Sequence, residues 1–163
     1  MNIGLPVSKQ QLEKVEILYG TDFFRWTQET AELIRQRRFD EIDLEHVAEE
    51  IEDIGKRDHR EVRSRLIVLV VHLLRWQLRP ERREASTWLR TINEQRTELQ
   101  LVIEDSPSLQ QIPAKQLPVV YRSAVGQATK ETGLSPRIFP ADCPYTPEQI
   151  LDDGFLPDGP LAD

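Results

Sequence analysis

The stretch DLEHVAEEIEDIGKRDHREVRSRLIVLVVHLLRWQL, residues 43–78, decides the fold expected for this chain. Apolar residues recur in it every three or four positions from Leu44 to Ile54 and again from Val62 to Trp76, which is the spacing of one helix face. Pro80 ends the pattern, because proline lacks a backbone donor and disfavours helical backbone at the residue before it. The sequence therefore predicts a helix capped by Asp43 and about 50 Å long at 1.5 Å per residue.

The centre of the core is expected in the second half of this helix. Residues 66–74, LIVLVVHLL, are apolar around the whole circumference apart from His72, so neighbouring elements must cover them on every side. The run is about half the length that spans a bilayer. Gly55 lies on the apolar face of the first half, where it marks either a break or a close helix contact.

Three further helices and a short one are predicted around the long helix. The first covers residues 21–37 with Thr21 as its N-cap, and the second begins at Ser86 or Thr87 and ends near Ser106. Another is expected from Pro118 to a left-handed stop at Gly133.

The C-terminal part of the chain is punctuated by prolines. The segment TPEQ, residues 146–149, has the pattern of a capping box that opens a short helix. The residues expected to anchor this part on the bundle are Phe139, Tyr145, Ile150 and Phe155. No strand pattern occurs, so the fold expected is all-α: a single-domain bundle of four principal helices over residues 21–157, with a lead-in at 1–20 and a tail at 158–163.

Composition narrows the function classes. The 163 residues carry a net charge of −7, which disfavours a globally basic nucleic-acid binder. Cys143 is the one cysteine, so no disulfide forms within the chain, as is usual in a reducing compartment. The N-terminal sequence has no signal-peptide pattern. We expect a cytoplasmic protein without a membrane partner.

A local basic segment interrupts the acidic chain at HLLRWQLRPERREASTWLRTINEQR, residues 72–96. Its arginines are Arg75, Arg79, Arg82, Arg83, Arg90 and Arg96. Arginine and tryptophan together can bind nucleic acid, but Trp76 and Trp88 each continue an apolar helix face. We predict a helix–loop–helix corner in which Trp76 and Trp88 are buried with Leu69, Leu73 and Ile92, and in which the arginines point outward or pair with carboxylates.

Two histidines are candidates for chemistry. His46 shares a helix face with Glu49 and Glu50, a spacing that suits a metal ion but equally a solvated face, which we favour. His72 lies in the apolar run and is expected to be buried with a hydrogen-bond partner. The alternative is a polar site in the bundle that combines His72 with Glu50, Asp53 or Glu94. Neither pattern predicts a metal or a cofactor.

Several segments together resemble a known family. They are YGTDFFRWTQETAELIRQRRFDEIDLEHVAEEIEDIG, HLLRWQLRPERR, STWLRTINEQR, EDSPSL, ETGL and FPADCPYTPEQILDDGFLP. Over about residues 19–157 the chain is similar to the bacterial family catalogued as domain of unknown function 29. The resemblance implies a compact helical bundle and carries over no catalytic residues. Pro113 and Pro118 depart from the more uniformly helical segment typical of the family at this place.

Three functions follow as hypotheses. The leading one is a non-enzymatic protein-binding or regulatory module. The second is a metal- or histidine-dependent enzyme with a site around His72, and the third is nucleic-acid binding through Arg75–Arg96. Eight acids and no base occupy Asp40–Asp53, so this block is also a candidate to face the arginine segment of a neighbouring element or of a second protomer.

Overall fold

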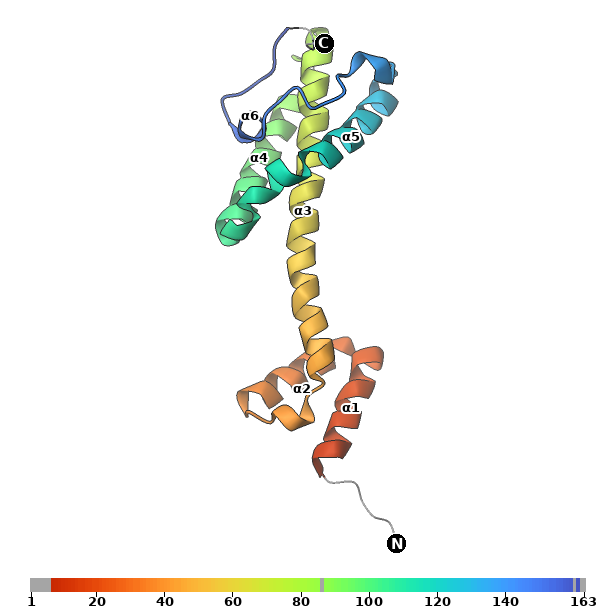
Figure 1. The fold of residues 1–163 in the computed structure, drawn as a ribbon, viewed down its shortest axis with the longest axis vertical. Helices are drawn as coiled ribbons and strands as arrows, with labels where there is room; N and C mark the ends of the chain where they lie inside the picture. The colour runs from red at the N-terminus through yellow and green to blue at the C-terminus, as the bar shows by residue number, and fades with distance from the viewer. Residues whose placement is uncertain (1–6, 86, 160, 162–163) are drawn as a thin grey trace. The chain divides into compact units, whose positions relative to one another are not determined.

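The long helix predicted from the sequence is confirmed in the computed structural model, which describes residues 7–85, 87–159 and 161 (Figure 1). Helix α3 runs without interruption over Leu44–Leu78. Gly55 does not break it, and beyond its chain neighbours and the adjacent helix backbone no heavy atom lies within 4 Å of the position that a Cβ would take there. Gly55 is therefore not a close helix contact within the described chain either.

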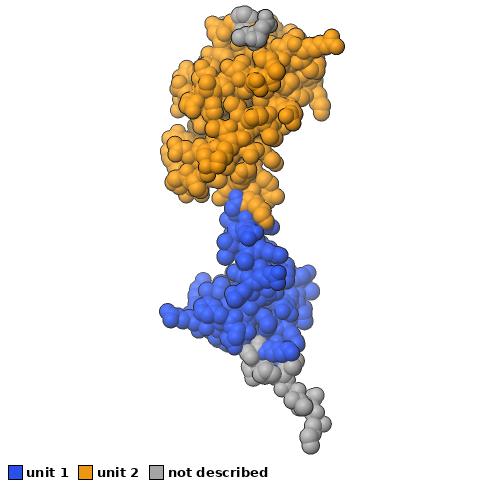
Figure 2. Space-filling view, viewed as in Figure 1, with its two compact units in different colours: residues 1–55 blue, residues 56–163 orange. Residues whose placement is uncertain are grey.

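The described residues contain no strand, which confirms the all-α class. In addition to α3 the helices are α1 (Val7–Thr21), α2 (Phe23–Arg35), α4 (Trp88–Asp105), α5 (Ile112–Thr132) and α6 (Pro147–Leu151). Short 3-10 turns lie at Phe39–Glu41, Pro80–Arg82, Pro107–Gln111 and Pro136–Ile138. The chain divides into two compact units, residues 1–55 and residues 56–163, which Figure 2 distinguishes by colour.

The first unit contains a helix where a loose lead-in was expected. The prediction for residues 1–20 is wrong from Val7 onward, because these residues form α1, while residues 1–6 lie outside the described part. Val15 and Leu18 of α1 are buried in the small core of this unit. The N-cap of α2 is Asp22, whose side chain accepts from the backbone NH of Arg25, and not Thr21.

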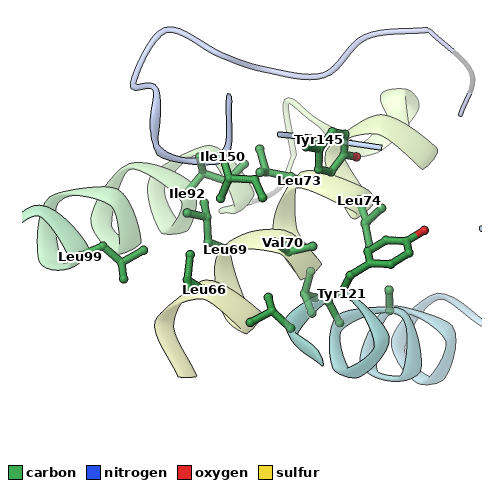
Figure 3. Packing of buried hydrophobic residues seen from close by; sticks show 14 of the residues in the cluster. Leu66, Leu69, Val70, Leu73, Leu74, Ile92, Leu99, Tyr121, Tyr145 and Ile150 are labelled. Carbon is green, nitrogen blue, oxygen red and sulfur yellow. The ribbon is translucent and has the colours of Figure 1, made fainter. Parts of the chain in front are cut away.

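The core of the second unit forms around the C-terminal half of α3, as expected. Leu66, Leu69, Val70, Leu73 and Leu74 are buried there together with side chains of α4, α5 and the C-terminal segment (Figure 3). The contributions labelled from those elements are Ile92, Leu99, Tyr121, Tyr145 and Ile150. Within the apolar run of residues 66–74, only Ile67, Val68 and His72 are partly exposed, and the other six residues are buried.

Helix α5 begins earlier than predicted. It starts at Ile112 and contains Pro118 in its interior. Proline there deprives the carbonyl of Ala114 of its helical partner, but Ala114 is exposed and water can take the place of the missing NH. Gly133 ends the helix with φ 70°, in the left-handed conformation predicted for it.

The C-terminal segment packs on this unit by the predicted devices. Thr146 and Gln149 form the capping box of α6, and Phe139, Tyr145 and Ile150 are buried. Phe155 is partly buried and meets the Tyr145 ring edge to face, at 5.8 Å between ring centroids. Of the predicted tail, residues 158, 159 and 161 are described, and the others lie outside the described part, as does the proposed cap Ser86.

Candidate protein-binding surface

Apolar side chains are distributed very differently in the two units. Among the described residues of the second unit, 18 hydrophobic side chains are buried and four large ones are exposed. In the first unit only five are buried, and eight large ones are exposed. Those eight are Ile17, Phe23, Phe24, Ile34, Phe39, Leu44, Ile51 and Ile54. Scattered exposed apolar residues are ordinary, so the excess in the first unit makes that unit the candidate region for an interaction surface.

The first turns of α3 carry the most regular part of this surface. Leu44, Ala48, Ile51 and Gly55 follow one another at spacings of four, three and four residues, so they share one helix face. All four are exposed, with Ile51 at 64%. Val47, on one flank of this face, is partly buried against the small core of the unit. The apolar face predicted for α3 is thus buried from Val62 to Leu73, but its first part, from Leu44 to Gly55, is exposed.

The opposite flank of this face is acidic. Glu45, Glu49 and Glu52 lie there at helical spacings and are exposed. Three other acids of the Asp40–Asp53 block are bonded within the unit. Glu41 pairs with Arg38, Asp43 with His46, and Glu50 with Tyr19. Glu45 and Glu49, together with Glu52, which also interacts within the chain, place negative charge beside the exposed apolar residues.

Helix α2 also carries exposed apolar side chains. Phe24 is 73% exposed, and Ile34, near the other end of the helix, is 41% exposed. The neighbouring face of α2 turns inward, where Trp26 stacks with Phe23 and meets the edge of Tyr19 at 5.0 Å between ring centroids. The aromatic side chains hold α1 and α2 together.

His46 belongs to the structural support of this surface. Its Nδ1 bonds the carboxylate of Asp43, and its ring lies 3.9 Å from the Tyr19 ring centroid to centroid. The hydrogen bond that His46 donates to Asp43 raises the pKa of His46, and the hydrogen bond that Tyr19 donates to Glu50 raises the pKa of Tyr19. Among the described residues no group of three or more His, Cys, Asp or Glu side chains is placed to hold a metal ion.

The candidate polar site around His72 is divided between the units. Glu50 and Asp53 belong to the first unit, and His72 and Glu94 to the second. The imidazole is half-buried, and its Nδ1 lies 2.8 Å from the carbonyl oxygen of Val68, so Nδ1 is the protonated donor. Burial lowers the pKa of His72. Glu94 is exposed on α4. The structure therefore does not bring these four residues together within either unit.

The arginine segment forms a corner between helices, but its details differ from the prediction. Trp88, Leu69, Leu73 and Ile92 are buried, whereas Trp76 is only partly buried. Trp76 lies in the last turn of α3, where it packs against the core from a partly buried position and not, as expected, a fully buried one. The guanidinium of Arg83 lies 5.0 Å from the Trp76 ring centroid.

Most arginines of this corner are bonded within the chain. Arg75 pairs with Glu131 at 2.6 Å and lies over the Trp88 ring at 4.9 Å. Arg79 donates to the carbonyl of Thr132, and Arg83 to the carbonyl of Trp76. Arg82 and Arg90 are exposed. The basic patch predicted from Arg75, Arg79, Arg82, Arg83 and Arg90 is therefore largely a set of internal contacts.

Arg96 has a role that the sequence did not reveal. It is 2% exposed and donates to the carbonyls of Ile150 at 2.9 Å and Phe155 at 2.8 Å. Its other nitrogen contacts, to the carbonyls of Gln149 and Asp153, are longer. This guanidinium fastens the segment around α6 to α4.

The second unit also has a half-open cleft of about 660 Å³ between α5 and the C-terminal segment. Its walls are mainly apolar and include Leu117, Val125 and Phe139, with Arg122 and Cys143 among the polar lining residues. Burial raises the pKa of the Cys143 thiol, so the thiol is protonated at neutral pH and a weak nucleophile. The cleft holds no activated nucleophile in its described lining.

Among the described residues, no helix has the length and apolar character needed to cross a membrane. The comparison with curated proteins and the comparison with solved structures each found no match. The model of the family described as "Domain of unknown function DUF29" matches residues 18–156, which include parts of both units. The chain belongs to this family.

Proposed function

We propose that this chain is a non-enzymatic protein-binding module that acts through the exposed apolar surface of its first unit. The observation that carries the proposal is the imbalance there, with eight large apolar side chains exposed against five hydrophobic side chains buried among the described residues. Each Å² of apolar surface removed from water contributes roughly 25 cal/mol, so covering this surface is a substantial driving force for association.

The proposal includes a regulatory or scaffolding role in a bacterial cytoplasm. The single cysteine, Cys143, is a free thiol, which supports a reducing compartment. Enzymatic chemistry around His72 receives less support, because the imidazole bonds a carbonyl of its own helix and Glu94, the proposed carboxylate in the same unit, is exposed on α4.

The test is differential capture from native cells with three forms of the full chain. Wild type is compared with Ile51→Ser, which removes an exposed apolar side chain of the first unit, and with Leu101→Ser, which does the same on α4 of the second unit. Leu101 is 51% exposed, close to the 64% of Ile51, so the pair is matched. Circular dichroism and thermal melts establish that all three forms are folded.

We expect proteins that are enriched by wild type and by Leu101→Ser and are lost with Ile51→Ser. Quantitative mass spectrometry of the captured material measures this difference. Identical protein profiles for wild type and Ile51→Ser, or enzymatic turnover of a small molecule that depends on His72, would contradict the proposal.

A further inference from the structure

We infer that the partner of the first unit presents a basic amphipathic helix, which lies along the α3 face formed by Leu44, Ala48, Ile51 and Gly55. This inference rests on the proposed function and specifies the chemistry of the partner. It follows from the shape of the face and from the charge beside it.

The shape of the face suits a helix. Two large side chains, Leu44 and Ile51, alternate with two small positions, Ala48 and Gly55, over three turns of α3. Large residues next to small ones form the ridges and grooves into which the side chains of a second helix fit.

Gly55 supports a close approach at this place. Glycine is unfavourable in a helix interior relative to alanine, and in the described chain nothing beyond the adjacent helix backbone and the chain neighbours lies within 4 Å of its Cβ position. Packing within this chain therefore gives no reason for glycine. A helix that passes close to the backbone of α3 at Gly55 would give one.

The charge beside the face selects the partner. Eight acids and no base occupy Asp40–Asp53, and Glu45, Glu49 and Glu52 lie exposed along one flank of the apolar face. Lysine or arginine on the flank of a docking helix would complement them, as the flanking charges of coiled coils do. A second copy that presented the same face would bring carboxylates opposite carboxylates, and an anionic nucleic acid would be repelled in the same way.

The experiment uses two fluorescent synthetic peptides with the same leucine heptads. One carries lysine at the flanking positions and the other glutamate, and both are titrated with the full chain in anisotropy measurements. We expect the lysine peptide to bind at least tenfold more tightly than the glutamate peptide. The triple variant Glu45→Lys/Glu49→Lys/Glu52→Lys is expected to reverse that preference.

Site variants separate this face from general attraction to an acidic protein. Ile51→Ser is expected to weaken the lysine peptide at least tenfold, and Leu101→Ser to leave its affinity within twofold of wild type. Circular dichroism confirms the fold of each variant. Weakening that is equal in the two variants, or absent from both, would overturn the docking site.

Failure of the inference is distinguishable from failure of the proposed function. Equal affinity for both peptides, lost with Ile51→Ser, would refute the basic partner but leave α3 as a protein-binding face. Failure of both peptides to bind would refute docking of an amphipathic helix, while the capture experiment still decides whether the unit binds proteins. A dimer in sedimentation that Ile51→Ser dissociates would identify a second copy as the occupant and overturn the inference.

Discussion

Arg96 of α4 donates its Nε to the carbonyl oxygen of Ile150 in α6 at 2.9 Å, across 54 residues of sequence. A second donation, to the carbonyl of Phe155 at 2.8 Å, fixes the same guanidinium. Buried charged groups are costly unless they are fully hydrogen-bonded, and here backbone carbonyls provide the bonds. The planar fork of arginine suits several carbonyls at once in a way that a lysine ammonium does not.

Arg96→Lys should therefore destabilise the second unit by roughly 2–4 kcal/mol, since hydrogen bonds to a charged group are lost in a buried site. Hydrogen exchange should rise first in residues 147–156. Chemical denaturation measures the stability, and Arg90→Lys is the control because Arg90 is exposed on the same helix. Equal effects of the two substitutions would mean that the carbonyl contacts of Arg96 contribute little.

The local sequence pattern predicted the parts of the fold that local rules determine. The extent of α3, the left-handed Gly133 and the capping box at Thr146 follow from periodicity, glycine and capping chemistry within a few residues. The apolar face of α4 was also correct, and Arg96 lies on it, four residues after the buried Ile92. That position was the available signal for the burial of Arg96.

The remaining features depend on tertiary context. The apolar residues of α1 do not lie on one face, since Ile17 is exposed while Val15 and Leu18 are buried under other elements of the first unit, so its own pattern was weak. Periodicity identifies an apolar face without showing what covers it. The sequence pattern therefore placed Leu44 and Ile51 on the same apolar face as Leu69, although only Leu69 is buried. The partners of His72 likewise depended on how distant segments fold.

Gly55→Ala should stabilise the chain by about 0.5–1 kcal/mol, because alanine is the better helix former and the Cβ meets no heavy atom within 4 Å. Gly126→Ala in α5 is a matched control, since Gly126 is helical and equally open. Gly133→Ala should destabilise, because φ is 70° there. Denaturant melts of the three variants measure these differences. A loss of stability in Gly55→Ala alone would reveal a close contact at that position.

Thr30→Val should stabilise the first unit by about 1 kcal/mol. The Thr30 hydroxyl is buried without a hydrogen-bond partner among the described residues, and valine removes that unsatisfied group at nearly the same shape. The control is Thr27→Val on the same helix, whose hydroxyl donates to the carbonyl of Phe24 at 2.7 Å. Thermal melts should show a gain for Thr30→Val only. A loss in Thr30→Val would indicate a water that satisfies the hydroxyl.

The two units should respond to pH in opposite directions. The Asp43 hydrogen bond raises the pKa of His46, with Glu49 and Glu45 nearby, so this contribution is full below about pH 6.5 and is lost as pH rises through the raised pKa. Burial lowers the pKa of His72, with Arg75 acting in the same direction. As pH falls below about 6.5, His72 is protonated more readily in the unfolded chain than in the folded chain, so the second unit loses stability.

Hydrogen exchange at pH 5.5 and pH 8, corrected for intrinsic rates, separates these effects. Residues 12–20 should be better protected at the lower pH, and residues 66–74 at the higher. His46→Asn and His72→Asn keep a donor near the Nδ1 position but do not titrate, so each should flatten the response of its own unit. Parallel responses of the two units in wild type would show that other groups control the pH dependence.

Nucleic-acid binding through residues 75–96 should be weak. The rings that would stack on bases are already occupied, since Arg75 lies over Trp88 and Arg83 over Trp76 at about 5 Å. Arg75 and Arg83 also bond Glu131 and the Trp76 carbonyl. With a net charge of −7, the chain supplies no general attraction for phosphates.

We therefore expect no submicromolar binding of single-stranded RNA or duplex DNA at about 150 mM salt, where exposed charges are screened within roughly 8 Å. Anisotropy titrations at several salt concentrations provide the measurement, and weak binding at low salt should fall steeply as salt increases. Arg82→Ala/Arg90→Ala tests the exposed arginines without disturbing the rings. Tight binding that this double variant abolishes would make the arginine corner a nucleic-acid interface. If that binding were also insensitive to salt, it would require bases to stack on the tryptophans, whose rings would first have to leave their guanidinium partners.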